Sequence, residues 1–191
     1  MIPEQDDPTH ALRAAVLKLR APEVSKRAPT PSSSVYGRAA AAVPADVRPP
    51  AERDALASRY RNIETSALMS GTTMALLVHP DNGDLPRDLV RSLELLVASG
   101  AQVVVLGTSV GRSIEAGLVR TIPLRADDAL HQEWALLALG PTKRVAFLAR
   151  LRADERWDWM ITRDPVAVHR AGTAILERVP FLRLRVPALD D

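Results

Sequence analysis

The chain has 191 residues, 47% of them hydrophobic and 25% charged, which is the balance of an ordinary globular protein. It contains no cysteine, which excludes disulfides, thiolate zinc sites, iron–sulfur clusters and a cysteine nucleophile. Its 25 basic and 23 acidic residues give a formal net charge of +2, without the basic stripe or reading module typical of nucleic-acid binders. We therefore expect no nucleic-acid partner.

No segment of the sequence predicts membrane insertion or secretion. No apolar run approaches the ~20 residues needed to cross a bilayer. The first residues include Glu4, Asp6 and Asp7, whereas a secretory signal begins with basic residues followed by an apolar stretch. Together with the missing cysteines, this predicts a cytoplasmic protein without membrane contact.

Residues 1–50 form a segment rich in proline and alanine, with eight of the 15 prolines of the chain. The segment also carries seven basic and five acidic residues, so the positive net charge lies here. We expect it to be flexible, with a linker over residues 21–50. The reason is that this composition buries too little apolar surface to offset the entropy lost on ordering.

A short helix is predicted within this segment, over residues 9–20. Thr9 is a suitable N-cap, and Leu12, Val16 and Leu19 fall on one face at helical spacing. Two interpretations remain open. The helix is either an incidental amphipathic turn or an element that docks on a partner or on the chain's own domain.

From residue 51 the pattern is that of an α/β domain, expected over residues 51–187. Residues 51–68 predict a helix, and the apolar run 74–78 predicts a strand buried on both faces. A helix over residues 84–100 follows, with aspartate as its N-cap and glycine after its last turn. A second buried strand is expected over residues 103–106, which completes a βαβ unit with parallel strands.

The rest of the domain predicts more strands and a last helix. Asp164-Pro165 is a strong signal for the start of a C-terminal helix, and alternation over residues 182–186 predicts a short edge strand. The fold class is therefore α/β, with a single mixed sheet of about five or six strands, flanking helices, one βαβ unit and a C-terminal helix. The other strands are expected at residues 118–124, 134–139, 144–151 and 157–162.

The loop over residues 107–113, Gly-Thr-Ser-Val-Gly-Arg-Ser, is a candidate ligand site, because open α/β sheets bind ligands at the carboxyl ends of their strands. It is one residue shorter than a phosphate loop and has arginine in place of lysine. Thr108, Ser109 and Arg112 therefore predict a site for an anion or a polar ligand, unless the loop is only a glycine-rich connector. The same letters fit G-x-S-x-G, which leaves open a serine hydrolase with Ser109 as nucleophile.

Three tryptophans are the most informative aromatic residues. Trp157 and Trp159 share one face of their strand, and with Trp134 they predict one wall of a ligand pocket; the alternative is ordinary core packing. Glu64 and Glu133 are the candidate polar groups of this pocket, and surface salt bridges are the alternative for each. The four histidines lack the spacing of a metal site, so we expect neither metal nor cofactor.

The order of these motifs resembles the DICT sensory domain, named from diguanylate cyclases and two-component systems. The similarity extends over residues 54–180 and is most specific at Glu133-Trp134 before an apolar strand and at Asp164-Pro165 after a later one. The resemblance implies a bacterial signal-sensing module without catalytic activity of its own. Members of this family are commonly joined to output domains.

Three hypotheses about function follow. The first is a non-catalytic sensory domain that binds a small molecule, or a signalling or output protein, and relays the signal by protein contact. The second is a small serine hydrolase that uses Ser109. The third is an adaptor that docks through its N-terminal helix.

Overall fold

A computed structural model of the chain describes residues 34–80, 85–107, 119–182 and 184–186. Helices and strands alternate along the described sequence, beginning with a short helix and ending with a 3-10 turn. The strands are β1 (Val47–Ala51), β2 (Met74–Val78), β3 (Gln102–Gly107), β4 (Val119–Pro123), β5 (Glu133–Leu139), β6 (Arg144–Leu151) and β7 (Trp157–Thr162). The helices are α2 (Val35–Ala40), α3 (Arg53–Met69), α4 (Arg87–Ala98) and α5 (Pro165–Leu176), with 3-10 turns η1 (Pro44–Asp46), η2 (Ala129–Gln132) and η3 (Pro180–Leu182).

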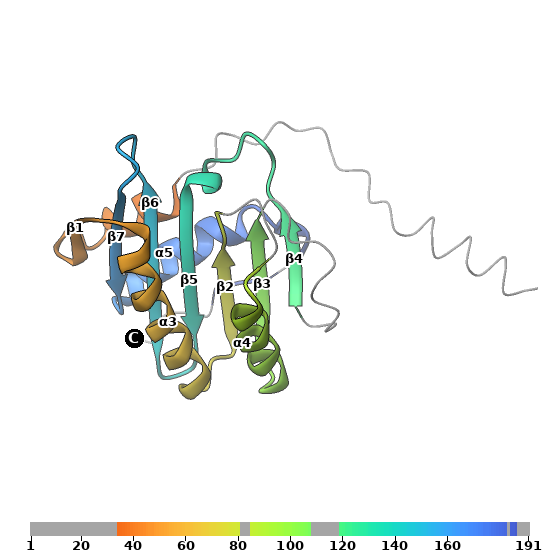
Figure 1. The fold of residues 1–191 in the computed structure, drawn as a ribbon. Coiled ribbons are helices and arrows are strands. Elements are labelled where there is room, and N and C mark those ends of the chain that lie inside the picture. Colours follow the sequence, from red (N-terminus) through yellow and green to blue (C-terminus); the bar gives the residue numbers. More distant parts are fainter. Residues whose placement is uncertain (1–33, 81–84, 108–118, 183, 187–191) are drawn as a thin grey trace, which may run out of the picture. The chain divides into compact units, whose positions relative to one another are not determined.

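One mixed sheet organises the domain (Figure 1), with its seven strands in the order β1-β7-β6-β5-β2-β3-β4. β2, β3 and β4 are parallel, whereas β1, β7, β6, β5 and β2 pair antiparallel. The predicted βαβ unit is confirmed as β2-α4-β3. The strands expected at residues 134–139 and 144–151 are β5 and β6, which pair antiparallel. The predicted fold class is confirmed, with one strand more than the five or six expected.

The sheet separates two hydrophobic cores. α3 and α4 cover the near face in Figure 1, and α5 covers the far face, where α2 also packs. Successive strand residues point to opposite faces, so Leu76 and Leu148 join the core under α2 and α5, while Leu77 and Phe147 join the core under α3 and α4. The helical layers explain why the central strands read as continuous apolar runs.

Capping residues, glycine and proline determine where the helices begin and end. Asp164 caps α5, because its carboxylate accepts a hydrogen bond from the Ala167 amide at 2.8 Å. Gly100 adopts the left-handed conformation after α4, with φ of 91°, as expected. α4 itself begins at Arg87 rather than at residue 84. The reason is that Pro86 disfavours a helical conformation at the residue before it.

Part of the segment that the sequence predicts to be a flexible linker forms regular structure. Residues 21–50 are expected to be flexible, but among the described residues from Ser34 onward α2, η1 and β1 all begin within this range. α2 buries Val35, Tyr36 and Ala39 in the core shared with α5. β1 tolerates its prolines because it is an edge strand that pairs only with β7. The predicted helix over residues 9–20 lies outside the described residues.

The predicted edge strand at residues 182–186 is wrong for the residues described there. η3 occupies Pro180–Leu182, and residues 184–186 belong to no strand. The apolar side chains of this segment pack into the core under α5, where Val186 is 9% exposed. The alternation thus reflects burial against a helix rather than pairing with the sheet.

Candidate functional site

A pocket of about 410 Å³ opens between α3 and α4. His79 follows β2 directly, so the pocket lies at the carboxyl end of a parallel strand, the usual place for ligands in α/β sheets. The helices contribute a polar rim, and the sheet side contributes an aromatic ring from β5. The lining residues on α3 are Arg53, Ala57, Tyr60, Arg61, Glu64 and Thr65, and the others are His79, Pro86, Asp88, Leu89, Ser92 and Trp134.

The floor of the pocket is aromatic. Tyr60 stacks on Trp134 with ring centroids 4.8 Å apart, and Phe147 meets Trp134 edge to face at 5.2 Å. Both pocket rings are at least nine-tenths buried, which gives a rigid apolar surface. Burial raises the pKa of the Tyr60 hydroxyl, and the nearby Glu64 carboxylate raises it further. Tyr60 therefore stays neutral.

Trp134 has an unsatisfied donor in this pocket. Its indole nitrogen is fully buried and lies near the Tyr60 hydroxyl, yet it makes no hydrogen bond of good geometry within the described residues. A buried donor without an acceptor is costly, and natural proteins leave few of them. The pocket thus holds one polar group whose hydrogen-bonding capacity the described structure does not use.

Glu64 is the half-buried acid of the pocket. Burial raises the pKa of its carboxyl, the hydrogen bond with Ser92 lowers it, and the charge of Asp88 raises it again. Arg61 provides a smaller opposing effect. Glu64 therefore joins α3 to α4 through Ser92 and presents a carboxyl group that is more easily protonated than an exposed one.

Cationic and helical groups surround the pocket. The Arg53 guanidinium lies 5.8 Å from the centre of the Trp134 ring, and Arg61 is on the same helix two turns later. α4 begins at the pocket after Pro86 and has no side chain that caps its N-terminus, while Asp88 lies in its first turn. The rim therefore combines charges of both signs above an apolar floor.

The other two tryptophans share the sheet face of Trp134, as predicted, but they do not line the pocket. Trp157 packs edge to face on Trp134 with ring centroids 6.3 Å apart. Trp159 donates its indole N–H to the Pro49 carbonyl at 2.9 Å, and Arg59 lies 4.5 Å over its ring. These two residues support the pocket floor and hold β1 against β7.

Glu133 lies on the opposite face of the sheet from Trp134. Its carboxylate oxygen Oε2 accepts hydrogen bonds from the amides of Val35 at 2.9 Å and Tyr36 at 3.1 Å. The side chain is buried, and this burial raises the pKa of the carboxyl although the hydrogen bonds from Ser34, Tyr36 and Val35 oppose the rise. Glu133 thus caps α2 and is not part of the pocket.

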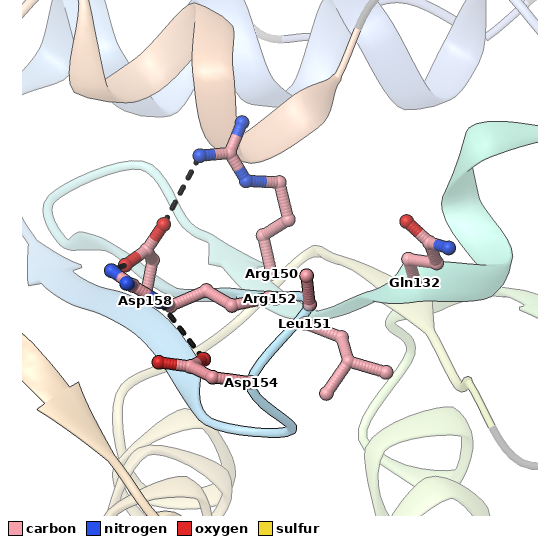
Figure 2. Close-up of a pocket in the computed structure, with 7 residues that line it drawn as sticks. Gln132, Arg150, Leu151, Arg152, Asp154 and Asp158 are labelled. Carbon is pink, nitrogen blue, oxygen red and sulfur yellow. Dashed lines mark hydrogen bonds and ion pairs between the residues drawn. The ribbon is translucent and has the colours of Figure 1, made fainter.

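A second hollow, of about 530 Å³, lies at the end of the β6-β7 hairpin. Figure 2 shows Arg150 and Arg152 turned toward Asp158, with N–O distances of 3.1 and 3.2 Å. Arg152 also pairs with Asp154 at 3.1 Å. Because these charges already pair with one another and no aromatic residue is among those that line the hollow, we favour the α3-α4 pocket as the candidate site.

Three predicted ligand-binding residues, Thr108, Ser109 and Arg112, lie outside the described residues. In the ranges that the structure does describe, no three histidine or carboxylate side chains gather as a metal site would require. The helices of those ranges are all too short or too polar to cross a membrane.

Sequence reasoning missed several residues of the pocket. No motif in the sequence indicates Tyr60, Arg61 or Ser92 as site residues, although Ala57, Tyr60, Arg61 and Glu64 recur on one stripe of α3. This stripe is visible in the sequence. Its pairing with Asp88 and Ser92 is not, because it depends on how α3 packs against α4.

The comparisons with known proteins add no family assignment. No family model matches the chain, and no curated protein matches its sequence.

Proposed function

We propose that this chain is a non-catalytic sensory domain of bacterial signal transduction that binds a small molecule between α3 and α4. The proposal includes relay of the bound state to a signalling or output protein by contact. The observation that carries it is the buried Trp134 indole N–H, which lies near the Tyr60 hydroxyl but makes no hydrogen bond of good geometry, in a pocket with an aromatic floor. The order of motifs that resembles the DICT domain supports the same function.

The lining of the pocket indicates the chemistry of the ligand. Tyr60, Trp134 and Leu89 offer apolar contact, which favours a planar or apolar part in the bound molecule. A hydrogen-bond acceptor on that molecule would satisfy the Trp134 indole N–H. The carboxyl of Glu64 and the guanidinium of Arg61 would fix the orientation of further polar groups.

A thermal-shift series with cyclic nucleotides, small anions and common metabolites tests the proposal on the full chain. A compound present at ~100 times its Kd should stabilise the fold by about 2.7 kcal/mol. Glu64→Gln should weaken binding of that compound by roughly tenfold, or about 1.4 kcal/mol, because the carboxylate is lost. Glu94→Gln changes an exposed glutamate of α4 that does not line the pocket, and it should leave binding unchanged.

Two results would contradict this function. One is that no compound in the series stabilises the chain and no partner protein is retained by it. The other is that a stabilising compound binds Glu64→Gln and Trp134→Phe as tightly as the wild-type chain.

A further inference from the structure

Two neighbouring residues of β5 connect the pocket to the other face of the sheet. Trp134 lines the pocket between α3 and α4. Glu133, the residue before it, points to the opposite face, because side chains alternate along a strand. Any shift of the β5 backbone at this point therefore moves a pocket residue and the Glu133 carboxylate together.

The Glu133 carboxylate holds the first residues of α2. It is 2% exposed, and one of its oxygens accepts the amides of Val35 and Tyr36, while the Ser34 side chain adds a further hydrogen bond. Ser34 is the N-cap of α2, with its hydroxyl accepting the Gly37 amide at 2.8 Å. The Glu133 carboxylate and the Ser34 hydroxyl thus hold the first turn of α2 in place.

The other contacts of α2 are an exposed ion pair, a cation–π contact and apolar packing. Arg38 pairs with Glu177 at 2.8 Å, but both side chains are substantially exposed, so the pair contributes little. Arg150 lies 5.1 Å over the Tyr36 ring, and α2 packs its apolar side against α5. Loss of the Glu133 contact would therefore loosen the first turn of α2 while its apolar packing keeps the helix near the domain.

We propose that β5 couples the pocket to α2 through Trp134 and Glu133. A molecule bound against Trp134 displaces the β5 backbone at Glu133. This displacement changes the hydrogen bonds that the Glu133 carboxylate accepts from the first amides of α2. α2 is then the element through which the change reaches a partner protein. This inference rests on the proposed function, because it takes the α3-α4 pocket as the place where the signal enters.

Hydrogen–deuterium exchange of the full chain tests the coupling without any ligand. Trp134→Phe replaces the indole that lines the pocket by a smaller phenyl ring. It should speed exchange at the α2 amides, residues 35–40, by at least fivefold. Glu133→Gln is the positive control for a weakened hold on α2. Trp157→Phe is the matched control, because Trp157 packs on the Trp134 ring from β7 but does not neighbour Glu133. It should leave α2 exchange within twofold of the wild-type rate.

The amides of β2, in the interior of the sheet, provide the reference for global unfolding and should keep their wild-type exchange. If Trp134→Phe does not fold, Trp134→Tyr replaces it with the same expected result. The coupling is overturned if α2 exchange in the Trp134 variant stays within twofold of wild type while Glu133→Gln raises it. It is also overturned if Trp157→Phe speeds α2 exchange as much. A screen in which no compound stabilises the chain and no partner protein is retained would contradict the proposed function and leave these exchange results intact.

Discussion

Glu133 and Trp134 are neighbours in the sequence and were expected to serve one pocket, but they lie on opposite faces of β5. Strand alternation alone could have separated them. The partner of Glu133 could not have been predicted, because Val35 and Tyr36 lie 98 and 97 residues away, in a segment expected to be a linker. A buried carboxylate next to a tryptophan therefore does not by itself indicate a ligand site.

The pH dependence of stability should report the burial of Glu133. The pKa of its carboxyl is raised in the folded state, mainly by burial, so the folded protein binds this proton more tightly than the unfolded chain does. The stability from this group is fully present below the unfolded pKa and is lost as pH rises through the folded pKa. The unfolding free energy of wild type minus that of Glu133→Gln should therefore fall as pH rises from the ordinary glutamate pKa of 4.5 through the raised pKa of Glu133.

Urea denaturation of both proteins across this range measures the difference directly. Glu64 also has a raised pKa, but it is present in both proteins and cancels in the comparison. A difference that stays constant with pH, or grows as pH rises, would contradict the assignment.

Helices and strands with strong local signals could be predicted, and those held by distant contacts could not. The β2-α4-β3 unit and α5 follow from apolar periodicity and from the Asp164-Pro165 start signal. α2 and β1 lie in a proline-rich segment whose composition predicts a linker. They are ordered by contacts formed only in the folded domain, such as the hydrogen bond from the Trp159 indole to the Pro49 carbonyl.

The cap of α5 offers a test of these local signals. Asp164→Ala removes the carboxylate that accepts the Ala167 amide, and we expect a loss of about 1 kcal/mol in the free energy of unfolding. Asp164→Asn keeps a side-chain oxygen at the cap and should lose much less. Chemical denaturation of the two variants beside wild type provides the measurement. Equal losses in both would show that the carboxylate charge, rather than capping, is the source of stability.

Across the whole domain, the sheet separates the candidate pocket from the contact that holds α2. The sequence identified Glu64 and Trp134 of the pocket, and also the shared face of Trp157 and Trp159 that supports it. The packing of α3 against α4 could not be predicted from the sequence, because it depends on the folded sheet beneath both helices. The stripe on α3 can be recognised as one side of a pocket only once Ser92 of α4 is known to hydrogen-bond with Glu64.

The most direct test of ligand binding between α3 and α4 is the indole region of a 1H–15N spectrum. The chain has three tryptophans, and the Trp134 cross-peak is assigned by its loss in Trp134→Phe. During titration with a compound that stabilises the chain, we predict that the Trp134 indole cross-peak moves as its N–H gains an acceptor. The Trp159 cross-peak, whose N–H is already bound to the Pro49 carbonyl, should stay in place. A stabilising compound that leaves the Trp134 cross-peak unmoved would contradict the account.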